Sequence, residues 1–353
     1  MAVTVRLCVG MFGVLVGLAA PVSAQMSPQD VADGLSELAS VPAATAGRVT
    51  EHDLEVAVAG TRVRDGADLV LVDDAWHVGS LTKSMTATLA ARLVEAGLIT
   101  WDTPVGEILG ERIPDMDEAW RDTPLRAFLT HRSGMAANLP ARSARQLGDG
   151  PRALYVTEML AGPPDATVGE FSYSNAGYVI AGAMLEDVGD APWEELMQTH
   201  VFTPLGMTSA GFGPPLGEAI EGHATRLFGG IRPVGQGFEA DNIPAMGPAG
   251  RVHLSAEDML IYMRTHLVRD AGFLSAESWD VLHAPVGEEA YAMGWGVGED
   301  GSLVHSGSNT LWYAVAFLDP EAGEAAFVAV NSGDLEDVVE PVDTALRELL
   351  GAL

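Results

Sequence analysis

Residues 79–84 read GSLTKS and hold the only lysine of the 353-residue chain, whose other basic residues are all arginine. Ser80 and Lys83 are three residues apart at a predicted helix start, so their side chains share one face. A serine hydroxyl becomes a nucleophile when a base lies beside it, and lysine can be that base once its pKa is lowered. Arginine cannot, because it keeps its proton. The stretch predicts a nucleophile–base pair, with a helix cap and a solvated lysine as the alternative.

The helix that follows this stretch is predicted from its apolar spacing. Leu81, Met85, Leu89 and Leu93 recur every four residues on one face, and Gly97 ends the pattern. We therefore predict a helix from Ser80 to Ala96. Its N-terminus would offer backbone N–H groups and a positive dipole end to an oxyanion.

The first 24 residues are predicted to be a secretory signal peptide. Arg6 precedes an apolar run from Leu7 to Ala20, and Val22-Ser23-Ala24 forms a small-x-small cleavage site. The mature chain would be residues 25–353, periplasmic or secreted, without cysteine and without a later apolar run long enough to span a membrane. An uncleaved membrane anchor is the alternative. The formal net charge of −30 argues against a nucleic-acid partner, because phosphate binding needs clustered cations.

The order of predicted elements favours an α/β (α+β) fold. Strands near both chain ends would form one antiparallel sheet, from about 45–78 and 290–353, with a mainly helical part at about 80–270 inserted between them. The predicted strands are Leu54–Val58, Leu69–Val72, Ala292–Val297, Leu303–Ser306, Tyr313–Leu318 and Ala325–Asn331. The further predicted helices are Gln25–Ser40, Pro124–Leu129, Asn175–Val188, Leu254–Leu267 and Leu335–Leu350.

Two further stretches carry groups suited to catalysis. Tyr173 and Asn175 lie at a turn before a helix, where a phenol can relay protons and an amide can bind a carbonyl. His305, Gly307 and Ser308 lie at the end of a short strand, where a glycine allows close backbone approach. Each stretch alone has a structural alternative, such as a helix cap or a strand-end histidine.

Three ordered blocks together resemble the serine β-lactamase-like hydrolases, the superfamily of class C β-lactamases, D-peptidases, penicillin-binding proteins and related esterases. The likeness spans about Leu54 to Gly333. The blocks are WHVGSLTKSMTATLAARLVEAGLITWDTPV (76–105), GEFSYSNAGYVIAGAMLEDVG (169–189) and LVHSGSNTLWYAVAFLDPEAG (303–323), supported by LTHRSGM (129–135), VFTPLGM (201–207) and GPAGRVHLSAEDM (247–259).

The resemblance implies a role for each matching residue. Ser80 would be the acylated nucleophile, Lys83 would help to deprotonate it, and Tyr173 would be the general base and proton relay. Asn175 would position the substrate carbonyl, and the N–H groups of Ser80 and Ser308 would form the oxyanion hole. The third block departs from the usual Lys-Thr-Gly of β-lactamases, because His305-Ser306-Gly307 stands there. A mostly neutral histidine is a weaker partner for a substrate carboxylate.

We therefore expect a secreted serine hydrolase that forms an acyl-enzyme on Ser80 and cleaves a small-molecule ester or a D-amino-acid-containing amide or peptide. The alternatives are a weak β-lactamase or D,D-carboxypeptidase, and a non-catalytic protein that binds or senses cell-wall peptides. No cofactor or metal is expected, since the nine histidines are scattered and no His-Glu-x-x-His occurs. Arg251 is interpreted as a structural ion-pair residue, with a substrate carboxylate as the alternative partner.

Overall fold

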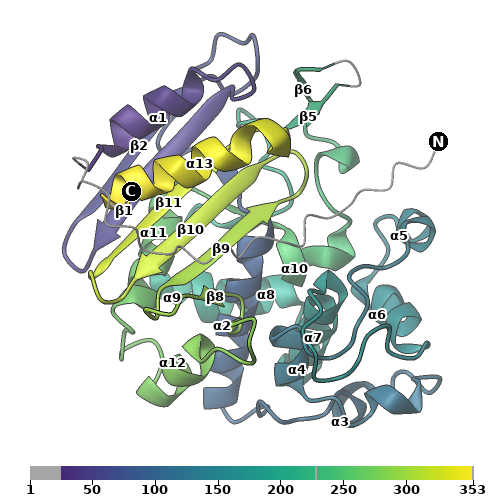
Figure 1. Cartoon of the computed structure of the whole chain (residues 1–353). Helices are drawn as coiled ribbons and strands as arrows, with labels where there is room; N and C mark the ends of the chain where they lie inside the picture. Colours follow the sequence, from purple (N-terminus) through teal and green to yellow (C-terminus); the bar gives the residue numbers. More distant parts are fainter. Residues whose placement is uncertain (1–24, 227–228, 352–353) are drawn as a thin grey trace.

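The computed structural model describes residues 25–226 and 229–351, so the predicted signal peptide lies outside the described residues. An antiparallel sheet with helices on both faces stands beside a mainly helical part (Figure 1). This arrangement confirms the predicted fold class, including a sheet built from both ends of the chain.

The main sheet has six strands in the order β2-β1-β11-β10-β9-β8, and neighbouring strands are antiparallel. β1 joins the two chain ends, because it pairs with both β2 and β11 and places Ala44 opposite Val330. The strands are β1 (Ala43–Thr50), β2 (Leu54–Gly60), β8 (Gly296–Val297), β9 (Leu303–Ser308), β10 (Tyr313–Asp319) and β11 (Glu324–Val330).

Strand assignments differ from the sequence prediction at β1 and at Leu69–Val72, and of the predicted strand Ala292–Val297 only Gly296–Val297 is a strand. The short strands outside the main sheet are also not predicted. β1 is not predicted, because its sequence AATAGRVT is rich in small residues with weak strand preference. The predicted strand at Leu69–Val72 is wrong, since this segment forms only an isolated bridge from Leu69 to Thr61. Leu69 and Leu71 are exposed there, so the apolar run has no neighbouring strand to pair with.

Helices cover both faces of the sheet (Figure 1). α1 (Pro28–Ser36) and α13 (Leu335–Leu350) pack on one face, and α11 (Ala256–Leu267) packs on the other. Small side chains bring the helices close to the sheet: Ala44 and Ala46 face the first pair, and a Cβ on Gly47 would lie 2.6 Å from the Leu260 side chain of α11. The predicted terminal helix Leu335–Leu350 is confirmed at both ends.

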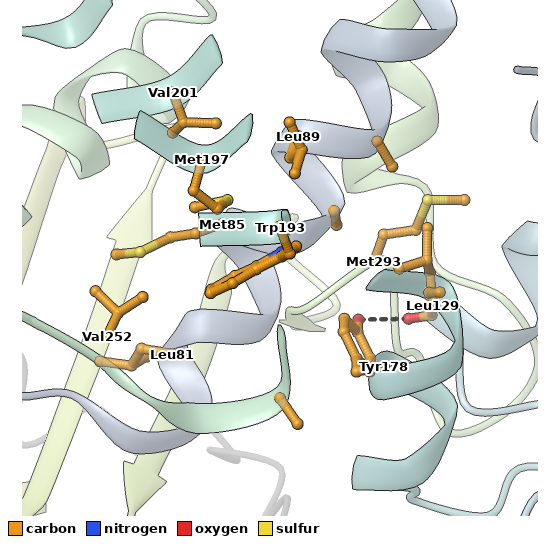
Figure 2. Packing of buried hydrophobic residues seen from close by; sticks show 14 of the residues in the cluster. Leu81, Met85, Leu89, Leu129, Tyr178, Trp193, Met197, Val201, Val252 and Met293 are labelled. Carbon is orange, nitrogen blue, oxygen red and sulfur yellow. Dashed lines mark hydrogen bonds between the residues drawn. The ribbon is translucent and has the colours of Figure 1, made fainter. Parts of the chain in front are cut away.

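α2 (Thr82–Glu95) is the central helix of the molecule and begins at the short helix η1 (Gly79–Leu81). Leu81, Met85, Leu89 and Leu93 are fully buried, as their spacing predicts, but residues on its other faces are buried too. Figure 2 shows Leu81, Met85 and Leu89 among buried side chains from several other segments, including Trp193 and Val252. A helix that is surrounded in this way is a rigid support for residues at its N-terminus.

The remaining elements form the helical part and two small sheets. β3-β7-β4 is a small antiparallel sheet that holds the chain just before η1. The remaining strands are β3 (Trp76–His77), β4 (Gly211–Phe212), β5 (His223–Thr225), β6 (Ile231–Pro233) and β7 (Val252–Leu254). The remaining helices are α3 (Val105–Leu109), η2 (Glu118–Trp120), α4 (Leu125–Leu129), α5 (Ala141–Leu147), α6 (Arg152–Leu160), α7 (Asn175–Gly189), α8 (Trp193–Met197), η3 (Gln198–Phe202), α9 (Thr203–Leu205), η4 (Phe238–Ala240), η5 (Pro244–Met246), α10 (Gly247–Gly250) and α12 (Ala276–His283).

Within residues 25–226 and 229–351, none of the helices has the length and apolar character needed to cross a membrane. The same residues contain no group of three or more His, Cys, Asp or Glu side chains placed to hold a metal ion.

Candidate active site

Ser80 lies in η1, at the point where strand β3 passes into helix α2. Gly79 makes this turn possible, because its φ of 51° is in the left-handed region that favours glycine. A Cβ on Gly79 would also lie 2.4 Å from the Ser308 backbone nitrogen at the end of β9. The turn therefore places the serine directly against the third motif.

Lys83 is one helical turn after Ser80, and its ammonium position is enclosed by protein. Its Nζ lies 2.9 Å from Ser80 Oγ and donates to the Ala249 carbonyl oxygen at 2.6 Å, and the side chain has no solvent exposure. Lys83 takes part in none of the ion pairs found among the described residues. Burial without a carboxylate lowers the pKa of Lys83 well below its ordinary value, so the neutral amine is favoured.

Tyr173 also lies beside Ser80, in the loop before α7, and its ring centroid is 5.1 Å from Lys83 Nζ. It shares a hydrogen bond with Ser80, and its ring centroid is 4.2 Å from that of His131. His131 Nδ1 in turn accepts the Ser174 N–H at 3.0 Å, which fixes the loop beside the tyrosine. Burial raises the pKa of Tyr173 above its ordinary value, although the Ser80 hydrogen bond acts in the opposite direction. The phenol is therefore protonated at neutral pH.

Asn175 is the first residue of α7, two residues after Tyr173. Its side-chain amide donates to Asn138 Oδ1 at 2.9 Å, and its backbone N–H donates to the Ala137 carbonyl at 2.9 Å. The hydrogen bonds of Lys83 Nζ go instead to Ser80 Oγ and the Ala249 carbonyl oxygen. Asn175 is thus tied to the 137–138 loop at the edge of the site.

Gly307 allows strand β9 to lie against the nucleophile turn. A Cβ at this position would lie 2.1 Å from the Val78 carbonyl oxygen and 2.7 Å from the Ser80 backbone nitrogen. The next residue is Ser308, whose backbone nitrogen faces Gly79. The two predicted oxyanion donors, the N–H groups of Ser80 and Ser308, therefore come from backbones in close contact.

His305 lies in a buried row of aromatic residues behind Tyr173. Its Nε2 is 3.3 Å from the Tyr291 hydroxyl, which is hydrogen-bonded to Tyr178, and Tyr178 donates to the Leu129 carbonyl at 2.6 Å (Figure 2). Because each hydroxyl has one proton to donate, this series of hydrogen bonds requires His305 to be in the tautomer with its proton on Nε2. Burial is the main cause that lowers the pKa of His305 to about 3, so the ring is neutral.

The structure thus brings Ser80, Lys83, Tyr173, Gly307 and Ser308 together, with Asn175 and His305 at the edges. The sequence did not reveal the series of hydrogen bonds through Tyr291 and Tyr178, because a buried tyrosine is equally typical of the hydrophobic core. The predicted structural role of Arg251 is supported by its ion pair with Asp241, at 3.0 Å. His131 lies in a block that supports the resemblance, and it packs beside Tyr173.

Known proteins share the sequence pattern and the fold of this chain. The sequence pattern of the beta-lactamase family matches residues 43–350. Penicillin-binding protein 4 of Amycolatopsis lactamdurans is 29% identical over 358 residues, which cover 92% of this chain and 89% of that protein.

Two solved structures share the fold. EstCE1, described as a hydrolase with promiscuous acyltransferase activity, has a TM-score of 0.78 at 16% identity, covering 91% of this chain and 96% of its own. The D-amino acid amidase from Ochrobactrum anthropi SV3, complexed with D-phenylalanine, has a TM-score of 0.74 at 19% identity, covering 91% and 98%. On the family match, this chain belongs to the beta-lactamase family and is a serine hydrolase.

Proposed function

We propose that this protein is an exported serine hydrolase that cleaves uncharged esters or D-amino-acid-containing amides through an acyl-enzyme on Ser80. The observation that carries the proposal is the enclosed Lys83, whose Nζ lies 2.9 Å from Ser80 Oγ and whose side chain has no solvent exposure. A neutral amine in that position can accept the serine proton, which is the step that makes the hydroxyl nucleophilic.

In acylation, Ser80 Oγ gives its proton to Lys83 and bonds to the substrate carbonyl carbon. The carbonyl oxygen becomes an oxyanion, to which the N–H groups of Ser80 and Ser308 donate. One such donor typically contributes about 3–4 kcal/mol to lowering the barrier. The Ala249 carbonyl accepts a hydrogen bond from the Lys83 amine, which keeps its lone pair aimed at the serine.

When the intermediate collapses, the bond to the leaving group breaks and that group takes a proton from the Tyr173 hydroxyl. Burial raises the pKa of Tyr173, so the phenol keeps its proton in the free enzyme and cannot take the first one from Ser80. We therefore assign the first proton transfer to Lys83, whose pKa is lowered, and the transfer to the leaving group to the phenol. In deacylation, water gives one proton to the phenolate and attacks the acyl carbon. Lys83 then returns its proton to the departing Ser80 oxygen, which restores every group.

The preference for uncharged substrates rests on His305. Its ring is neutral and its Nε2–H is directed to Tyr291, so it offers no positive charge to a substrate carboxylate. The formal net charge of −30 adds a general repulsion of anions. The similarity in fold to EstCE1 and to the D-amino acid amidase is compatible with both substrate types.

A second candidate is a weak β-lactamase or D,D-carboxypeptidase. The observation that favours it is the 29% identity with penicillin-binding protein 4, over 92% of this chain. These activities act on substrates that carry a carboxylate, so the same substrate comparison separates the two candidates.

The nucleophile is tested with a fluorophosphonate probe, which reacts with activated serines. We expect labelling of the wild-type protein, loss of labelling in Ser80→Ala, and unchanged labelling in the control Ser143→Ala on α5. Lys83→Arg keeps a positive charge but cannot accept a proton, so it should lose most activity. Labelling that survives Ser80→Ala, or full activity in Lys83→Arg, would refute the proposal. Absence of any labelling, with ligand binding retained, would favour a non-catalytic binding protein.

The substrate class is tested with two aryl esters of similar length, a butyrate and a hemisuccinate, beside a D-phenylalanine anilide and a chromogenic cephalosporin. We expect kcat/KM for the butyrate to exceed that for the hemisuccinate by about tenfold or more, and His305→Lys to narrow this ratio. Cephalosporin turnover far above ester turnover would instead establish the second candidate.

Export is proposed from the pattern of residues 1–24 alone. N-terminal sequencing of the protein recovered from the periplasm or medium should begin at Gln25. Recovery of the full-length chain in the membrane fraction would contradict cleavage.

A further inference from the structure

A buried histidine–carboxylate contact lies behind the nucleophile turn, and the proposed mechanism does not use it. His77 Nε2 is 3.0 Å from Asp241 Oδ1, and the two side chains are 0% and 1% exposed. His77 Nδ1 accepts the backbone N–H of Gly79 at 3.2 Å. This acceptor role places the imidazole proton on Nε2, facing the carboxylate. The histidine–carboxylate pair is therefore hydrogen-bonded to the backbone of Gly79, the residue directly before Ser80.

Asp241 also contacts the other side of the site. Asn309, which directly follows Ser308, donates from its side-chain amide to Asp241 Oδ1 at 3.1 Å. Arg251, two residues after Ala249, lies with its Nε 3.0 Å from Asp241 Oδ2. One carboxylate thus connects three segments: the turn before Ser80, the end of β9, and the stretch that carries the hydrogen-bond partner of Lys83.

The charge at this position is balanced. Burial by itself would raise the pKa of Asp241, but His77, Arg251 and Asn309 together lower it to about 2, so the group stays ionised. A bare anion near a developing oxyanion would oppose catalysis. With Arg251 beside it, the carboxylate can accept several hydrogen bonds without leaving an uncompensated buried charge.

The two backbones that meet in the site are anchored separately: β3 pairs with β7, and the end of β9 pairs with β10. Gly79 and Gly307 have no side chains at the contact, and glycine is the residue whose backbone is least restrained. The flanking residues link the two separately anchored segments to each other. His77 holds the peptide N–H of Gly79, and Asn309 holds the chain just after Ser308, each through Asp241.

We propose that Asp241 and His77 are positioning residues for the oxyanion hole, which set the distance and direction of the Ser80 and Ser308 N–H groups. This inference rests on the proposed acyl-enzyme function. It predicts that the contact between His77 and Asp241 stabilises the transition state more than the ground state, because the oxyanion forms only after Ser80 attacks the carbonyl carbon.

The test uses Asp241→Asn, His77→Phe and the double variant, with kcat and KM measured on a neutral aryl ester. We expect kcat to fall about 10- to 100-fold with KM within about threefold, since small displacements of reacting groups cost up to about 10²-fold. The inhibition constant of an aryl boronic acid, which forms a tetrahedral adduct, should weaken in the same proportion. The double variant should equal the worse single variant, because the two residues act as one unit.

Matched variants separate positioning from folding. Asp258→Asn removes a buried carboxylate that is hydrogen-bonded to Ser209 at the start of α11, so it should lower stability with little effect on kcat. His77→Asn keeps an acceptor near the Nδ1 position, so it should retain more activity than His77→Phe. Asn309→Ala removes the amide link to Asp241, together with the side-chain bonds to Ala240 and Leu311, and its effect can be measured even if Asp241→Asn folds poorly.

Two outcomes would overturn the proposal. One is kcat within about threefold of wild type in the folded single variants or in Asn309→Ala. The other is an activity loss in Asp258→Asn as large as that in Asp241→Asn, which would show a general packing effect. Fluorophosphonate labelling distinguishes these results from failure of the proposed function: the positioning variants should still label at Ser80, more slowly, whereas a wrong nucleophile would leave labelling in Ser80→Ala.

Discussion

Gly307→Ala is the substitution whose effect can be worked out most directly from the structure. Gly307 does not have a positive φ, so an alanine there carries no dihedral strain and the effect comes from space alone. The new Cβ would lie 2.1 Å from the Val78 carbonyl oxygen, 2.7 Å from Ser80 N and 3.0 Å from Leu81 N. All three are backbone atoms, so no flexible side chain can move aside.

The displacement follows from these contacts. To reach ordinary contact distance, β9 and the nucleophile turn must separate by about 1 Å. The two segments carry the Ser80 and Ser308 N–H groups, so the oxyanion hole opens by a similar amount. Misplacement by about 1 Å can cost about 10²-fold in rate, and loss of one donor costs about 10²–10³-fold. We therefore expect kcat to fall about 10²–10³-fold, with a stability loss of about 1–3 kcal/mol from overpacking.

The measurement is steady-state hydrolysis of a neutral aryl ester, together with the rate of fluorophosphonate labelling and urea denaturation. The control is Gly34→Ala in α1, where a Cβ would meet nothing within 4 Å. That variant should keep full activity and gain about 0.5–1 kcal/mol, because glycine is unfavourable inside a helix. A folded Gly307→Ala protein with kcat within about threefold of wild type would refute the reasoning.

Three further predictions concern the proton transfers and the helical part. At pH values between its lowered folded-state pKa and about 10.4, Lys83 binds a proton in the unfolded chain but not in the folded one, so the stability of the wild-type protein should rise with pH across this window. Urea denaturation of Lys83→Met should show no such rise. Parallel stability profiles of the two proteins against pH would contradict the lowered pKa of Lys83. Tyr173→Phe should lower kcat for an anilide by about 10²–10⁴-fold and for an aryl ester by less, because an amine must be protonated to leave; equal losses on both substrates would argue against the acid role. Arg152 is buried between Glu186 and Glu194, so Arg152→Met should cost about 2–3 kcal/mol of stability with kcat unchanged; unchanged urea denaturation would show that the ion pairs contribute nothing.

The sequence predicted the helices better than the strands. The spacing of Leu81, Met85, Leu89 and Leu93 predicted α2, because a buried face repeats with the helical period. β1 was missed because its stability comes from β2 and β11 on either side, neither of which is visible in a local window. Conversely, Leu69–Val72 has strand-forming residues but forms only the isolated bridge to Thr61. Leu69, Leu71 and Val72 are exposed, and only Val70 is buried.

For the site, the sequence by itself determined which residues are present and which share a helical turn. Ser80 and Lys83 must lie together, because three residues in a helix bring their side chains to one face. Only the tertiary structure decided how these groups titrate. The pKa of Lys83 is lowered because residues far away in the chain, Ala249 and Tyr173 among them, exclude water from it. His305 holds one tautomer because the Tyr291 hydroxyl oxygen accepts a hydrogen bond from its Nε2–H. Burial and hydrogen-bond direction depend on distant segments meeting in space, so no local pattern could specify them.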